Sequence, residues 1–393
     1  MKWTQLILII LLVTNISAQS KWSCIDIKGN KIFSTEVKSV SDFSGGLAKI
    51  CKYEVVNRKK VRRYGYVNTQ GKIVIPCIYR TAKNFNGSVA WVKKPNSEFY
   101  TLIDKTGTEL ATRQYKKVGS ILKENSDRIA VYDNGKMGFI NDKGQEVISC
   151  KYLGAPFFKE GLCCVIPYDS KSGQYGFIDI NGKVVLPFQY KQAGFSSFND
   201  GLCRVSVDGK TVLIDKTGKV VFKTNYGSLQ KFHQGRAAVA TKSNRKGWGF
   251  VNEQGNLVID GNYDHVTAFS KDGWAIVEKD RLQGLIDTDG TEILPLKYES
   301  IYADLSEDGY VGGIYPAVEG TSYANTKKDY FLKDMKPLMT KVKYLQSANN
   351  TDRILFCNPE GKIGYMDRSG TIVINAIYSK GKQFHEGSAW VKE

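Results

Sequence analysis

The feature that most constrains the fold of this chain is a tandem repeat in which a tyrosine follows a glycine by eight residues. Units of about 37 residues cannot bury a core alone, so neighbouring units must stack on one another. The repeated glycines are Gly29, Gly71, Gly107, Gly144, Gly182, Gly218, Gly255, Gly290 and Gly370. The tyrosines are Tyr79, Tyr115, Tyr152, Tyr190, Tyr226, Tyr263, Tyr298 and Tyr378, together with Tyr344 in a unit that has lost its glycine.

Each unit reads as a hairpin followed by a further strand. An apolar run ends in Asp or Asn, and a glycine comes three residues later, as in Leu102–Gly107 and Phe177–Gly182. The Asp or Asn side chain can bond the backbone two residues on, and glycine accepts the left-handed conformation that closes the turn. After the tyrosine comes a phenylalanine, a polar turn with glycine and a small residue, as in Phe198–Cys203. We expect about three short strands per unit.

The overall composition agrees with an all-β chain. The 393 residues include 38 glycines against 9 prolines, and aromatic residues make up 12%. Tight turns between short strands use glycine, and aromatic residues suit pleated surfaces. We count ten units, the first with Val37 in the tyrosine position. The prediction is an all-β tandem-repeat solenoid or superhelix of β-hairpins with about ten units, and the alternative is a β-propeller-like arrangement, which typically has four strands per blade.

The closest copies of the motif carry a resemblance to a known family. They are Trp248–Asn252, which reads Trp-Gly-Phe-Val-Asn, and Tyr64–Asn68 with Gly71–Pro76. The chain resembles the WG-repeat (KWG-repeat) proteins of bacteria over nearly its whole length after residue 20. The naming tryptophan survives in this pattern only at Trp248. The resemblance implies an interaction module without known catalytic residues.

The first twenty residues are typical of a secretory signal peptide. Lys2 is the charged start, Leu6–Val13 is an apolar run too short to span a bilayer, and Ala18 or Ser20 offers a small residue for cleavage. We therefore expect an exported chain of residues 21–393, in the periplasm, at the cell surface or secreted, with no membrane span. Removal of Lys2 would lower the formal net charge from +17 to +16.

The positive charge favours anionic partners outside the cytoplasm. Several lysines simply follow a turn glycine or lie close to one, so a solvated basic surface is the simpler interpretation and a dedicated binding patch is the alternative. We expect a protein or an anionic glycan of the cell envelope as partner and no nucleic acid.

Catalytic and metal-binding patterns are absent from the sequence. The chain has 8 cysteines and 3 histidines, and no CxxC pair or phosphate-binding glycine loop occurs. Cys163 and Cys203 occupy a position that holds alanine in other units, so buried thiols are favoured over disulfides. The plentiful aspartates are explained by the hairpin turns. We expect no enzyme activity, no cofactor and no metal.

The aromatic residues are the remaining binding candidates. The strict spacing of the tyrosines favours a buried packing ladder, and a row that stacks on sugar rings is the alternative. Trp91, Trp248, Trp274 and Trp390 are further candidates for contact with a ligand. The predicted function is an exported, non-catalytic protein-interaction scaffold of the bacterial envelope, with a glycan or cell-wall binding module as the alternative.

Overall fold

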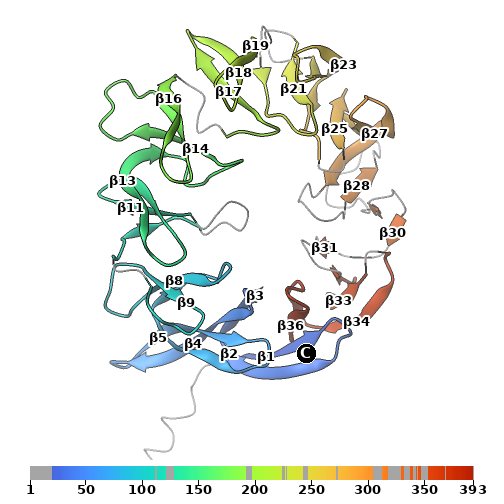
Figure 1. The fold of residues 1–393 in the computed structure, drawn as a ribbon. Helices are drawn as coiled ribbons and strands as arrows, with labels where there is room; N and C mark the ends of the chain where they lie inside the picture. The colour runs from blue at the N-terminus through green and yellow to red at the C-terminus, as the bar shows by residue number, and fades with distance from the viewer. Residues whose placement is uncertain are drawn as a thin grey trace, which may run out of the picture.

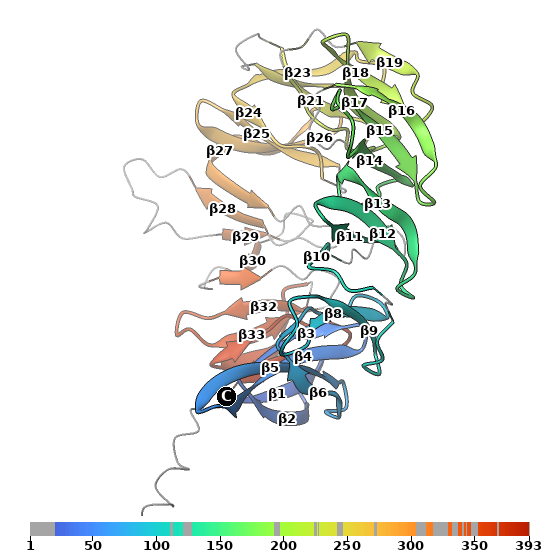
Figure 2. The ribbon, with the colours of Figure 1, turned by 90° about the vertical axis from the view of Figure 1, so that its left-hand side faces the viewer.

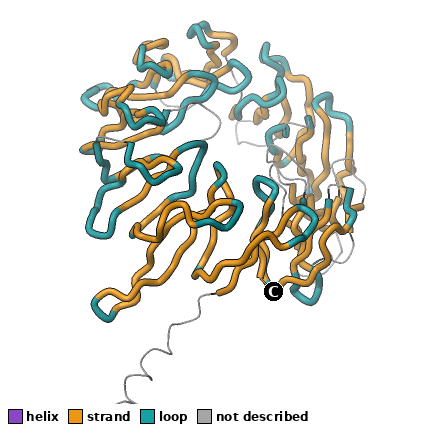
Figure 3. The backbone as a smooth tube through the Cα atoms, turned by 60° about the horizontal axis from the view of Figure 1, so that its bottom comes forward, coloured by secondary structure: helices purple, strands orange, loops and turns teal. Residues whose placement is uncertain are grey.

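The computed structural model forms a ring of small antiparallel sheets. Figure 1 shows the sheets following one another around the ring, and Figure 3 shows strands and loops without helices in the described residues. The prediction of an all-β repeat fold is confirmed. The structure describes residues 20–110, 113–120, 128–191, 197–223, 226, 228–241, 247–270, 273–303, 312–316, 329–331, 337–339, 342, 344–346, 353–367 and 369–392.

The ring is closed by the two ends of the described chain. Strand β1 (Ser20–Asp26) pairs antiparallel with β36 (Ser388–Lys392), and Cys24 lies opposite Trp390. Figure 2 shows the same red and blue strands side by side from a second direction. Of the two expected arrangements, the structure therefore has the propeller-like ring and not the open solenoid.

The units are blades, which we number from 1 to 10 in chain order. Blade 1 is the closing sheet β2-β1-β36-β35, blade 2 is β3-β4-β5-β6, and blade 7 is β20-β21-β22-β23. Two seven-stranded sheets each span two successive blades, because β13 and β27 run on from one blade into the next. Complete blades have four strands, so the expectation of three was wrong. The additional first strand is only two residues long in several blades, for example β7 and β20.

The strand bounds follow the repeat. The remaining strands of blades 1–5 are β2 (Lys31–Val37), β3 (Ser39–Ser44), β4 (Leu47–Val56), β5 (Lys59–Asn68), β6 (Ile73–Tyr79), β7 (Thr81–Ala82), β8 (Val89–Lys93), β9 (Thr101–Asp104), β10 (Lys117–Val118), β11 (Ile129–Asp133), β12 (Lys136–Ile140), β13 (Glu146–Gly154), β14 (Leu162–Pro167), β15 (Tyr175–Asp179), β16 (Val184–Tyr190) and β35 (Lys380–Gly381). Blades 6–10 contain β17 (Leu202–Val207), β18 (Lys210–Asp215), β19 (Val220–Lys223), β20 (Ser228–Leu229), β21 (Ala237–Ala240), β22 (Trp248–Val251), β23 (Leu257–Tyr263), β24 (His265–Val266), β25 (Trp274–Lys279), β26 (Leu282–Asp287), β27 (Glu292–Ala303), β28 (Gly312–Pro316), β29 (Asp329–Phe331), β30 (Pro337–Met339), β31 (Tyr344–Gln346), β32 (Ile354–Cys357), β33 (Ile363–Met366) and β34 (Ile372–Tyr378).

The hairpin between the third and fourth strands of a blade is fixed by its Asp or Asn. In blade 6, the Asp215 carboxylate accepts hydrogen bonds from the backbone N–H of Thr217 at 2.9 Å and of Lys219 at 3.1 Å. The Thr217 hydroxyl donates to the same oxygen, and this bond lowers the pKa of Asp215 below its ordinary value. The turn glycine, Gly218, has a φ of 86°, a conformation that a side chain disfavours.

A second glycine, on the third strand, lies where the fourth strand bulges. Beside Gly249, Trp248 pairs with Tyr263 but Phe250 pairs with Ile259, so the fourth strand has two extra residues. A Cβ at Gly249 would lie 2.4 Å from the Ile259 carbonyl oxygen. The same offset accompanies Gly65, Gly138, Gly176, Gly284 and Gly364.

Two blades without this glycine pair differently. Ser23 takes its position in blade 1 and Val212 in blade 6, and there the third and fourth strands pair without the offset. Blade 3 has Thr101 in this position and keeps the offset, because Tyr100 pairs with Tyr115 and Ile103 pairs with Glu109. Where the glycine is present, the backbone of the bulge approaches it too closely for a Cβ, but the Thr101 blade shows that the offset does not require glycine.

The core lies between blades. One buried cluster joins Leu186 and Tyr190 of blade 5 with Phe198 and Val212 of blade 6. The turns also meet across blades: the Glu386 carboxylate of blade 1 accepts hydrogen bonds from the N–H groups of Gly45 and Gly46 of blade 2, both at 2.7 Å. Each blade thus packs on its neighbours, as stacked repeats require.

Candidate functional site

The repeated tyrosines pack within the ring with one clear exception. Among the described strands, the fourth strand of a blade ends at its repeated tyrosine in four cases, which are Tyr79, Tyr190, Tyr263 and Tyr378; Tyr79, for example, pairs with Tyr64. Tyr79, Tyr115, Tyr152, Tyr190 and Tyr378 are buried, and Tyr226, Tyr263 and Tyr298 are half-buried. Tyr344 is 41% exposed. In this structure the tyrosines are packing residues, except in the degenerate unit.

The four tryptophans expected as ligand contacts are placed mostly inside the ring. Trp91 and Trp390 have no exposed surface, and Trp274 is 5% exposed. Trp390 packs on Phe43 and Phe33, with ring centroids 5.5 and 5.3 Å away. Trp248 is half-buried. The three buried indoles offer no face to a ligand in this structure, because strands of the next blade cover them.

The eight cysteines are free thiols, and six of them are buried. Burial raises the pKa of Cys24 and of Cys77 to about 11. Burial also raises the pKa of Cys150 and of Cys163. Cys163 packs in the small-residue position, where its thiol contacts the Ala155 carbonyl oxygen at 3.2 Å.

The burial of these thiols predicts a slow reaction with a thiol reagent at pH 8. Because the thiolate is the reactive form, a thiol with a raised pKa and a buried side chain reacts slowly. We expect the thiols of the folded protein to react much more slowly than those of the unfolded protein. In the unfolded protein, all eight thiols should react. Rapid reaction of all thiols in the folded state would contradict the burial, and fewer than eight after unfolding without reductant would reveal a disulfide.

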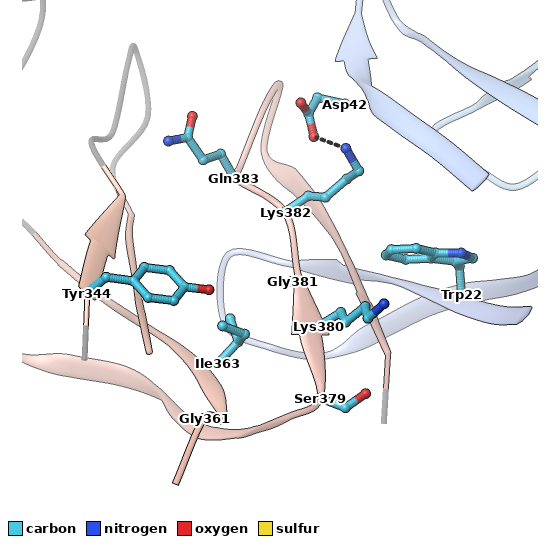
Figure 4. A pocket seen from close by; sticks show the side chains of 10 residues that line it. All are labelled: Trp22, Asp42, Tyr344, Gly361, Ile363, Ser379, Lys380, Gly381, Lys382 and Gln383. Atoms are coloured by element: carbon cyan, nitrogen blue, oxygen red, sulfur yellow. Dashed lines mark ion pairs between the residues drawn. The ribbon is translucent and has the colours of Figure 1, made fainter. Parts of the chain in front are cut away.

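A cavity lies where blade 10 meets blade 1, beside the ring closure. Its volume is about 600 Å³, in the range of small-molecule sites. Figure 4 shows Tyr344 and Trp22 on opposite sides of the segment Ser379–Gln383, with the Tyr344 hydroxyl directed toward that segment. Ile363 of β33 lies between them. The cavity therefore combines aromatic and polar groups from both ends of the described chain.

The cavity carries positive charge. Lys380 and Lys382 line it, and Asp42 supplies the carboxylate among the described lining residues. Lys382 Nζ lies 3.7 Å from Asp42 Oδ1, and Lys392 Nζ lies 4.7 Å from the centroid of the Trp22 ring.

Two lysines beside this cavity are affected by their positive neighbours. Burial lowers the pKa of Lys49, and Lys382 lowers it further, while Cys51 acts in the opposite direction. Burial, Lys380 and Lys38 lower the pKa of Lys392. An anion in the cavity would relieve the repulsion among these ammonium groups.

A second surface feature runs along the fourth strands, which form the free edges of blades 2, 5, 6, 7 and 10. At the same positions just after the turn glycine, these strands carry branched apolar side chains that are 37–43% exposed. They are Ile73, Val184, Val185, Val220, Val221, Leu257, Val258 and Ile372. We call this set the edge row. Exposed lysines precede it at Lys72, Lys183 and Lys219.

Sequence reasoning missed both features. Trp22 lies on β1 four residues before Asp26, as Trp248 lies four residues before Asn252, so it occupies the motif's tryptophan position with Ser23 in place of the glycine. That spacing could have identified it. The cavity itself had no such signal, because its walls come from the two ends of the described chain.

Two negative findings concern metal ions and membranes in the described part of the chain. Those residues contain no group of three or more His, Cys, Asp or Glu side chains placed to hold a metal ion. They also contain no helix with the length and hydropathy of a bilayer span.

Comparison with protein families gives one match. The model described as WG containing repeat matches residues 22–54, 64–96, 137–166, 175–210, 213–243, 248–282, 284–311 and 363–393, which is more than half of the chain. A search of curated proteins returns no significant match.

Several solved structures are weakly similar. The crystal structure of a eukaryotic initiation factor is 12% identical, with 95% of this chain and 98% of that chain covered and a TM-score of 0.48. AztD of Citrobacter koseri is 12% identical, with 94% and 95% covered and a TM-score of 0.28. Hsv2 of Kluyveromyces lactis is 12% identical, with 71% and 90% covered and a TM-score of 0.34.

Proposed function

Because the chain belongs to the WG-containing repeat family, we propose that it is an exported, non-catalytic scaffold of the bacterial envelope that binds a partner protein along its edge row. The observation that carries this proposal is the recurrence of exposed apolar side chains at the same positions of blades 2, 5, 6, 7 and 10. Single exposed apolar residues are ordinary, but a row repeated from blade to blade forms an extended contact surface.

The charge beside the edge row indicates the chemistry of the partner. Lys72, Lys183 and Lys219 are exposed and lie directly before apolar residues of the row. A partner with apolar side chains flanked by Asp and Glu would complement this pattern in both respects, and opposite charge would speed the encounter. We therefore propose that the partner is an acidic protein of the envelope.

Export is supported by the position of the first strand. The buried residues Trp22–Ile25 belong to β1, which begins at Ser20. Cleavage after Ala18 would leave this strand whole, and the closing sheet needs it to pair with β36. The signal peptide and the closed ring are thus compatible.

The test uses valines of the edge row and a matched pair elsewhere. We expect V184T/V185T/V220T/V221T to lose most binding to an acidic envelope protein that the native ring captures, because threonine keeps the shape of valine but adds a hydroxyl. Val55 and Val56, which are 67% and 36% exposed on the β4 hairpin, supply the control V55T/V56T, which should bind normally. Affinity is measured by calorimetric titration of the purified captured protein.

Two outcomes would overturn this proposal. One is equal binding by the edge-row variant and the native ring. The other is an affinity that does not fall between low salt and about 0.5 M salt, since exposed charge pairs are screened at that ionic strength.

A further inference from the structure

We propose that the cavity between blades 10 and 1 is a binding site for an acidic sugar, a sugar ring that carries a carboxylate. This inference does not rest on the edge row, which lies on other residues. It gives the ring a small-molecule specificity in addition to the proposed protein contact.

The first argument is the unusual state of Tyr344. Most of the repeated tyrosines are buried or half-buried between blades, whereas Tyr344 is 41% exposed and lines the cavity. Its aromatic face is therefore available to the apolar face of a sugar ring, which stacks well on such surfaces. Ile363 adds apolar surface beside it.

The second argument is the charge of the lining. Lys380 and Lys382 bring two ammonium groups, and Asp42 is the carboxylate among the described lining residues. Two further lysines lie near this lining. Lys392 is repelled by Lys380, and Lys49 is repelled by Lys382. The excess of positive charge favours an anion, and a sugar carboxylate can accept hydrogen bonds from a lysine.

The third argument is that the cavity also needs hydroxyl groups from its ligand. Asp42 Oδ1 is buried and, beyond its ion pair with Lys382, has no hydrogen-bond partner among the described residues. The Asp42 side chain as a whole is 37% exposed, so the other oxygen of its carboxylate is the one to which a sugar hydroxyl in the cavity would donate. A simple inorganic anion would satisfy the lysines but not Asp42.

The experiment is calorimetric titration of the protein without residues 1–19 with D-glucuronate and N-acetylneuraminate. D-Glucose, acetate and inorganic phosphate are the comparison ligands. We expect at least one acidic sugar to bind, with D-glucose, acetate and phosphate each at least about tenfold weaker, because each lacks part of the complementary chemistry. Its affinity should fall as salt rises.

Two variants locate the site. We expect Y344A to weaken acidic-sugar binding at least about tenfold by removing the stacking surface. K382M should weaken the acidic sugar by a similar factor while leaving the weak affinity for D-glucose unchanged. The control is Y168A, because Tyr168 is 40% exposed and has Lys136 Nζ 4.7 Å from its ring, yet lies outside the cavity.

Several outcomes would overturn the site. They are no binding of either acidic sugar, phosphate binding as tightly as the sugars, or unchanged sugar binding in both Y344A and K382M. Circular dichroism of each variant checks that the ring is intact. An intact ring that binds the protein partner but no sugar would refute this inference alone.

Discussion

Replacing Tyr190 with alanine is expected to lower the free energy of unfolding by about 3–5 kcal/mol, as for other large buried aromatic residues. Tyr190 is 1% exposed and packs on Tyr175 and Phe177, with ring centroids 5.9 and 6.2 Å away. Its removal would leave a cavity in the core between blades 5 and 6. The measurement is urea unfolding followed by circular dichroism and fluorescence.

The control is Tyr344, which the sequence spacing assigns to the degenerate unit but which the structure places at the start of β31. Tyr344 is 41% exposed, so Y344A should cost less than about 1 kcal/mol. The two tyrosines differ in position as well as in burial, because Tyr190 ends β16 whereas Tyr344 begins β31 and pairs with Cys357. If Y190A also cost less than about 1 kcal/mol, the tyrosines would not be the packing ladder that the structure shows.

Replacing Gly176 with alanine is the second change with a large expected effect. The new Cβ would lie 2.5 Å from the backbone oxygen of Leu186, and the backbone of the bulge cannot yield as a flexible side chain would. We expect a loss of stability of about 3 kcal/mol, at the upper end for overpacking. Urea unfolding measures it.

The control for this glycine lies in the same blade. Gly161 has a φ of 85° but no atom within 4 Å of an added Cβ. G161A should therefore cost only about 1 kcal/mol, from backbone strain alone. Equal losses in G176A and G161A would show that conformation, and not the bulge, explains the aromatic-glycine motif.

Much of the fold could be predicted because its signals are local. The hairpin turn at Asp215 and Gly218 depends on residues within five positions, so it recurs visibly in the sequence. The short first strands could not be predicted, because two residues such as Thr81 and Ala82 are too few to show alternation. Ring closure pairs Cys24 with Trp390, and no local pattern marks so distant a contact.

The candidate site was less accessible to sequence reasoning. The sequence offers Trp91 and Trp390 as candidate ligand contacts, yet both are buried beneath the next blade, because large apolar side chains in a stacked repeat pack in the interface between units. Lys382 and Trp22 meet only because the ring closes. Tyr344 differs from the other tyrosines because it begins β31, the first strand of blade 10, a position that its sequence spacing does not indicate.

The pairing of β1 with β36 also has a consequence for the order of assembly. Other blades are built from consecutive strands, so they can form as the chain emerges and add to one another in turn. Blade 1 can be completed only after the other blades, because two of its strands, β35 and β36, come from the far end of the described chain. A contact between such distant segments pays a large loop-closure entropy and forms slowly. Until it forms, β1 and β2 remain a two-strand hairpin with one unpaired edge, and the ring is an open arc.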